Sequence, residues 1–112
     1  MQTTITVKVN EQEVLKKFND EQFAKLDAEF KRDAVQMLRA TLPAKIKEKI
    51  RADHAQYGVM WIHDGELGHF SFGMHVRNFL RQNGFRDELT PTGNLDDCYI
   101  PLLEAACDLR EL

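Results

Sequence analysis

Between residues 19 and 41 apolar side chains recur at helical spacing, and this stripe most constrains the fold that the chain can adopt. Its members are Phe23, Leu26, Phe30, Ala34, Met37 and Leu38, and the opposite face carries Lys25, Glu29, Arg32 and Gln36. Asn19, with Gln22 three residues on, is typical of a helix N-cap. Pro43 disfavours helical geometry at the residue before it, so the helix should end near residue 41. The pattern predicts one amphipathic helix over 19–41 in a mainly helical domain.

Four further helical segments follow from local start and stop signals. The predicted segments are a short helix over 11–18 after Asn10, a helix from Pro43 to Gly58, a helix over 72–83 between Ser71 and Gly84, and a last segment over 95–112. Pro101 interrupts the last segment, because proline lacks a backbone N–H and clashes with the preceding turn. Either that helix kinks at Pro101, or its main part starts there.

Two stretches predict β-structure. Residues 3–9, TTITVKV, alternate strictly between apolar and polar side chains, which indicates a half-buried strand. Asp64-Gly65, inside VMWIHDGELGHF, is a hairpin signal, with an irregular loop over 59–70 as the alternative. The expected fold is therefore mostly α, of the α+β class. It is a compact bundle of four to five helices with a short N-terminal strand. A small hairpin is possible at Asp64-Gly65.

The length fits a single domain over 1–112, divided into an N-terminal part (1–41) and a motif-bearing helical part (42–112). The N-terminus lacks the apolar core of a signal peptide, and no apolar run approaches the length of a membrane span. We therefore expect a cytoplasmic protein without membrane contact. Cys98 and Cys107 are nine residues apart, too far along one helix for a disulfide, and are expected to be buried thiols in a reducing compartment.

Charge is unevenly distributed along the chain. Residues 31–51 hold seven Lys or Arg and two acids, whereas residues 86–112 hold seven acids and two Arg. These segments could lie on solvated faces, lie against each other, or form a bipolar surface that steers a partner. The formal net charge of −3 lacks the basic excess of most nucleic-acid binders, so a nucleic-acid partner is not expected. If the chain did bind a nucleic acid, the contact residues would be Lys45, Lys47, Lys49 and Arg51, which we call the basic row.

Polar groups gather in residues 68–84, GHFSFGMHVRNFLRQNG. The candidate ligand-binding residues are His69, Gly73, Arg77, Asn78 and, downstream, Asp97. A helix N-terminus with an arginine can hold a phosphate or a carboxylate. The alternative is structural: Arg77 pairs with Asp96 or Asp97, and His69 and Asn78 satisfy backbone groups.

No pattern in the chain predicts a metal, a cofactor or catalysis. His63, Asp64, His69 and His75 are close in sequence, but their spacing matches no zinc motif. Nothing local sets a serine or cysteine beside a base, so we expect a non-enzymatic protein. Trp61 is either a core residue or, if exposed, an anchor for a partner.

The run HFSFGMHVRNFL resembles a small family of helical domains from bacteria and their phages that share a His-x3-Gly-Met/Leu-x2-Arg-Asn core. The matching residues are His69, Gly73, Met74, Arg77 and Asn78, with LPAKIKEKI (42–50) before them and LDD (95–97) after them. The likeness covers roughly residues 40–107. FLRQNGF follows Arg-Asn where the family has a Trp-rich stretch, and Pro101 interrupts the last helix. The resemblance implies a helical fold with a shared polar core and no particular reaction.

The leading functional hypothesis is a protein-binding module, such as a phage-type inhibitor or a regulatory subunit. Its candidate contacts are the basic row and Trp61, and an exposed N-terminal strand could pair with a second copy. The alternatives are a phosphate- or nucleotide-binding domain that uses His69, Arg77 and Asn78, and nucleic-acid binding through the basic row.

Overall fold

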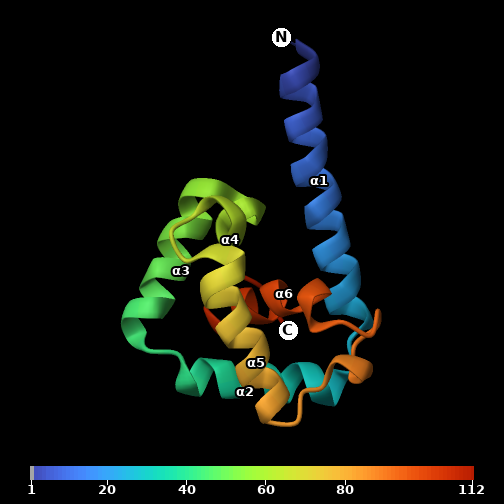
Figure 1. Cartoon of the computed structure of the whole chain (residues 1–112), viewed down its shortest axis with the longest axis vertical. Helices are drawn as coiled ribbons and strands as arrows, with labels where there is room; N and C mark the ends of the chain where they lie inside the picture. Colours follow the sequence, from blue (N-terminus) through green and yellow to red (C-terminus); the bar gives the residue numbers. More distant parts are fainter. Residues whose placement is uncertain (1) are drawn as a thin grey trace.

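The computed structural model describes the backbone of residues 2–112 and the side chains of residues 11–112, and it is a helical bundle (Figure 1). Its α-helices are α1 (Gln2–Lys25), α2 (Ala28–Thr41), α3 (Ala44–Tyr57), α4 (Trp61–Asp64), α5 (Met74–Gln82) and α6 (Tyr99–Ala106). Shorter turns join them: 3-10 turns at η1 (Gly58–Met60), η3 (Asp87–Leu89) and η4 (Leu95–Asp97), and a π-helical segment at η2 (Gly68–Gly73). The prediction of a mostly helical bundle is confirmed.

Helix α6 forms the centre of the core. Every residue from Tyr99 to Ala106 is buried, and α6 packs against α2 and against the C-terminal half of α1. Pro101 lies in the first turn of α6, where a missing N–H costs no helical hydrogen bond. Of the two alternatives at Pro101, a kink or a main helix that starts there after a separate turn, the structure agrees with the second to within two residues.

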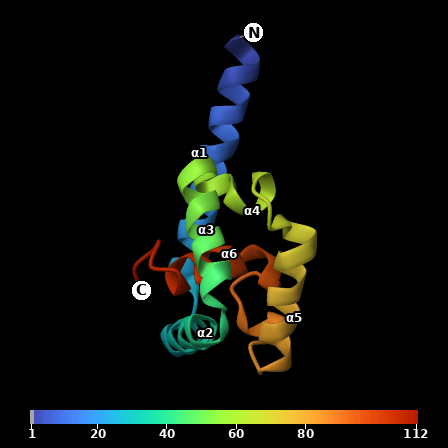
Figure 2. The same cartoon turned by 90° about the vertical axis from the view of Figure 1, so that its left-hand side faces the viewer.

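Helix α1 extends beyond the rest of the bundle. Both views show its N-terminal part standing clear of the other helices (Figures 1 and 2). The side chains of residues 11–14 are exposed, and Asn19 is the first along the described part of α1 to be buried. The helices among the described residues are too polar or too short to span a membrane.

The predicted helix start at Asn19 is wrong, and the break falls at Asp27. The Asp27 side chain accepts a hydrogen bond from the backbone N–H of Phe30 at 3.1 Å and caps α2. Asn19 and Gln22 lie inside α1 and face the core. The apolar stripe is nonetheless correct, because Phe23 on α1, Leu26 directly after α1 and Phe30 on α2 all contribute to one core.

The predicted β-elements do not form in the described residues. Residues 3–9 belong to α1, and no other segment offers a strand edge for them to pair with. The proposed hairpin over 59–70 is replaced by η1, α4 and the start of η2. Gly65 is required for close packing: a Cβ there would come within 2.4 Å of the Trp61 carbonyl oxygen and 2.5 Å of an Asp53 carboxylate oxygen.

Candidate functional site

Arg77 is the centre of a polar group, which we call the Arg77 cluster: His69, Arg77, Asp96 and Tyr99. Arg77 and Tyr99 are buried, whereas His69 is half-buried and the Asp96 side chain is 42% exposed. The Arg77 side chain is 7% exposed, and its Nε lies 2.7 Å from Oδ1 of Asp96. Its guanidinium stacks 4.8 Å from the centre of the Tyr99 ring, and its Nη1 donates to the His69 carbonyl at 3.3 Å. The cluster joins η2, α5, η4 and α6, segments that are remote in sequence. These contacts correspond to the structural alternative, an ion pair between Arg77 and Asp96.

His69 completes the cluster as a neutral ring. Burial raises the pKa of Tyr99 to about 12, so its hydroxyl stays protonated and donates to Nδ1 of His69 at 2.5 Å. Arg77 Nη1 lies 3.3 Å from the same nitrogen. Two donors at Nδ1 leave the ring proton on Nε2. Burial, and then the charge of Arg77, lower the pKa of His69, so protonation of the ring would oppose the cluster.

Gly73 allows the cluster to close. A Cβ at Gly73 would come within 2.5 Å of the Tyr99 hydroxyl and 3.1 Å of an Arg77 guanidinium nitrogen. The π-helical segment that ends at Gly73 brings His69 back over α5, with the Phe72 N–H donating to the Leu67 carbonyl at 3.4 Å. Ser71, predicted as a helix cap, instead donates from its hydroxyl to the Leu67 carbonyl within this segment.

Two of the predicted ligand residues contact other groups. Asn78 is exposed, and its side-chain oxygen accepts a hydrogen bond from Arg81 at 3.0 Å. The Asp97 carboxylate accepts from the Thr92 hydroxyl at 2.8 Å, while its neighbour Asp96 is the acid that meets Arg77. The structure therefore brings His69, Gly73 and Arg77 together and leaves Asn78 and Asp97 outside the cluster.

The predicted basic row is largely engaged in contacts within the chain. Lys47 donates to the Arg39 carbonyl at 2.5 Å, and Lys49 pairs with Glu66. Arg51 donates to the Cys107 carbonyl at 3.0 Å, and its guanidinium also lies 3.9 Å from Asp108. Lys45 is exposed at the start of α3. A phosphate backbone would have to compete with these contacts.

Trp61 is fully buried, which corrects its assignment as a candidate interface anchor. Its indole N–H donates to Oε2 of Glu104 at 3.0 Å. Glu104 is itself 3% exposed, and its Oε1 accepts from Nε and Nη2 of Arg110 at 3.1 and 3.0 Å. A buried carboxylate is retained at low cost only when it is paired in this way.

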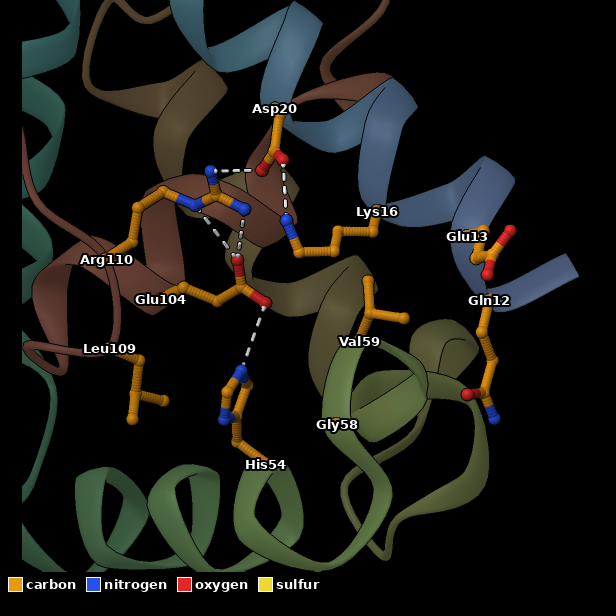
Figure 3. A pocket seen from close by; sticks show the side chains of 10 residues that line it. All are labelled: Gln12, Glu13, Lys16, Asp20, His54, Gly58, Val59, Glu104, Leu109 and Arg110. Carbon is orange, nitrogen blue, oxygen red and sulfur yellow. Dashed lines mark hydrogen bonds and ion pairs between the residues drawn. The ribbon is translucent and has the colours of Figure 1, made fainter. Parts of the chain in front are cut away.

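The Glu104 network opens into a groove that sequence analysis did not predict (Figure 3). Arg110 also donates to Asp20 on α1 at 2.7 Å, and this bond lowers the pKa of the Asp20 carboxyl. On the other side, Nε2 of His54 lies 3.9 Å from Glu104. The groove measures about 560 Å³ and separates α1 from the end of α3 and from α6. Its walls comprise Gln12, Glu13, Lys16, Asp20, His54, Gly58, Val59, Glu104, Leu109 and Arg110.

One sequence signal could have indicated the groove. Glu104 is the only charged residue in the stretch YIPLLEAA, which otherwise reads as a buried helix. A lone acid in such a helix requires a cationic or donor partner. Arg110 lies six residues on, but Asp20 and His54 are remote and only the fold brings them near.

The described residues contain no group of His, Cys, Asp or Glu side chains that could hold a metal ion. Cys98 and Cys107 are buried and not joined by a disulfide. Burial raises the pKa of Cys98 to about 12, and burial also raises that of Cys107. Neither thiol is therefore prepared to act as a nucleophile near neutral pH.

Comparison with known proteins adds no relative: no family model, curated protein or solved structure matches the chain. The functional argument therefore depends on the geometry of this chain.

Proposed function

We propose that the chain is a non-enzymatic protein-binding module that takes a segment of a partner into the groove beside α1. The observation that carries this proposal is the coincidence of two features. A groove of about 560 Å³ lies next to a helix whose side chains at residues 11–14 are exposed. Grooves between helices are a common way to receive a helical or extended segment of another protein.

The groove has the mixed character of a protein interface. Val59 and Leu109 are half-buried apolar residues on its walls. Arg110, 20% exposed, and His54, 31% exposed, add polar groups beside them. Arginine and partly buried apolar side chains at the centre of a contact typically supply most of its binding energy. A regulatory subunit or a phage-type inhibitor would act through such a surface.

The other functional hypotheses have less support. In the ligand-binding alternative, Arg77 would have to exchange its contacts with Asp96 and Tyr99 for a phosphate. In the nucleic-acid alternative, the basic row would have to release Glu66 and Asp108. The likeness to the phage and bacterial family also stays a proposal. Its His, Gly and Arg positions correspond to the Arg77 cluster, which supports a structural meaning for that motif.

The experiment is a binding assay with a variant that blocks the groove. Val59→Arg places a long cation on the groove wall, and Val14→Arg, on the exposed face of α1, is the matched control. We expect the wild type and the control to bind one protein in stoichiometric amount, counting a second copy of the chain as such a protein. The Val59→Arg variant should no longer bind this protein, and its melting temperature should equal that of the wild type. The proposal fails if the chain is strictly monomeric and recovers no stoichiometric partner, or if both variants bind as the wild type does.

A further inference from the structure

The N-terminal part of α1 stands clear of the other helices in both views (Figures 1 and 2). With 24 residues, α1 is roughly 36 Å long, and the described side chains before Leu15 are exposed. The sequence of its first turns, QTTITVKV, is rich in β-branched residues, which form helices poorly. Most helical stability in proteins comes from the packing of one face. A helical outer half therefore requires a surface to cover it.

The groove face of α1 indicates what that surface is. Glu13, Lys16 and Asp20 line the groove at intervals of three and four residues and so form one stripe along the helix. Glu13 and Lys16 on this stripe carry opposite charges and lie three residues apart, so the stripe is complementary to a second copy of itself that runs in the opposite direction.

We infer that a second copy of this chain fills the groove, with the two α1 helices antiparallel about a two-fold axis that passes between Glu13 and Lys16. In this arrangement, Glu13 of each copy faces Lys16 of the other. The register brings position 9 of one copy opposite Asp20 of the other. The N-terminal turns of each α1 then run along the groove that Val59 and Leu109 line in the other copy.

The arrangement satisfies the requirements of a symmetric dimer. A two-fold interface uses the same patch on both copies and must be self-complementary, as a Glu13 and Lys16 pair is. Lys16 now contacts Asp20 at 3.0 Å, with the two side chains 69% and 43% exposed. Exposed pairs of this kind contribute little, so Lys16 can exchange one acid for another at small cost. This inference rests on the proposed function and names the occupant of the groove.

Charge reversal at the two positions tests the inference by sedimentation equilibrium of the full chain. The wild type should dimerise. Glu13→Lys and Lys16→Glu should each raise the dimer Kd about tenfold or more, because each sets like charges face to face. The double variant should restore the dimer. A mixture of the two single variants should form the heterodimer in preference to either homodimer.

Lys45→Glu is the matched control for Lys16→Glu, since it makes the same change in net charge on an exposed residue at the far end of α3 from the groove. It should dimerise as the wild type does. A wild type that stays monomeric at its highest soluble concentration overturns the inference. Single variants without effect, or a double variant without rescue, also overturn it. If the chain is monomeric yet loses a different partner on Val59→Arg, the proposed function holds and only the second copy is excluded.

Discussion

At the scale of single residues, position in the fold distinguishes groups that the sequence makes look alike. Asp96 and Asp97 are adjacent, and either could pair with Arg77 on sequence alone. The 3-10 turn at η4 directs Asp96 to Arg77 and Asp97 to Thr92. Trp61 and Glu104 form a similar case, because their hydrogen bond joins residues 43 positions apart. Local patterns predict that such groups need partners, but only tertiary packing selects them.

His69 makes folding stability depend on pH. Its pKa is lowered in the folded chain, by burial and then by Arg77, and unfolding returns it to its ordinary value of 6.5. Between these two values the unfolded chain binds a proton that the folded chain does not. The free energy of unfolding should therefore fall as pH falls through 6.5 and level off below the folded pKa. The measurement is urea unfolding at a series of pH values from neutral to acidic.

His69→Asn should remove this part of the pH dependence, while His75→Asn, at an exposed position on α5, should keep it. Asp87 does not interfere with this comparison, because hydrogen bonding from Arg81 lowers its pKa to about 2. Its effect on the free energy of unfolding is therefore confined to pH values below its ordinary pKa of 3.8. An equal slope in the wild type and in His69→Asn would show that His69 is not part of the cluster in solution.

At the scale of elements, the sequence predicted which side chains face the core better than it predicted the residues at which each helix begins and ends. The apolar stripe over 19–41 is real, yet it is shared by two helices because Asp27 rather than Asn19 provides the cap. Strict alternation over 3–9 predicted a strand, whereas these residues continue α1. A strand needs a neighbouring edge for its hydrogen bonds, and the described part of the fold provides none.

Asn19 on α1 offers a test of element packing. It is 2% exposed, and its side-chain nitrogen lacks a hydrogen-bond partner among the described residues. A buried donor in this state costs about 1–3 kcal/mol. Asn19→Leu keeps a similar size and removes the donor, so it should raise the free energy of unfolding by about 1 kcal/mol. The check is chemical unfolding beside Gln12→Leu, a change on the exposed part of α1 that should have little effect.

A lower stability for Asn19→Leu would mean that the amide has a partner in solution or that leucine does not fit between α1 and α6. The melting temperature of Asn19→Ala would separate these outcomes, because alanine relieves crowding without restoring a hydrogen bond.

At the scale of the whole molecule, opposite charges partly neutralise each other inside one chain. Arg39 and Arg51 from the basic segment both approach Asp108 of the acidic segment, at 3.2 and 3.9 Å. The uneven charge along the sequence is therefore in part a means of joining α2 and α3 to the C-terminal end. Of the three interpretations that the sequence left open, the one in which the basic and acidic segments lie against each other agrees with these contacts.

The mostly helical fold could be predicted from periodicity. Of the polar residues predicted as a group within 68–84, the structure brings His69, Gly73 and Arg77 together and leaves Asn78 outside. The groove could not be predicted, because α1, α3 and α6 supply its walls from distant parts of the chain. The same limit applies to α1: the exposure of its side chains at residues 11–14 becomes evident only in the assembled bundle.

We infer that the Arg77 cluster holds the fold together and leaves binding to the groove. The most direct test of this inference is the free energy of unfolding of Asp96→Asn beside Asp97→Asn, which remove the same charge from adjacent residues. Asp96→Asn removes the charge that pairs with the buried Arg77 guanidinium and should cost about 1–3 kcal/mol, whereas Asp97→Asn should change the stability by about 0.5 kcal/mol or less. If Asp96→Asn is as stable as the wild type, the cluster does not support the fold, and Arg77 becomes the residue to test with anionic ligands.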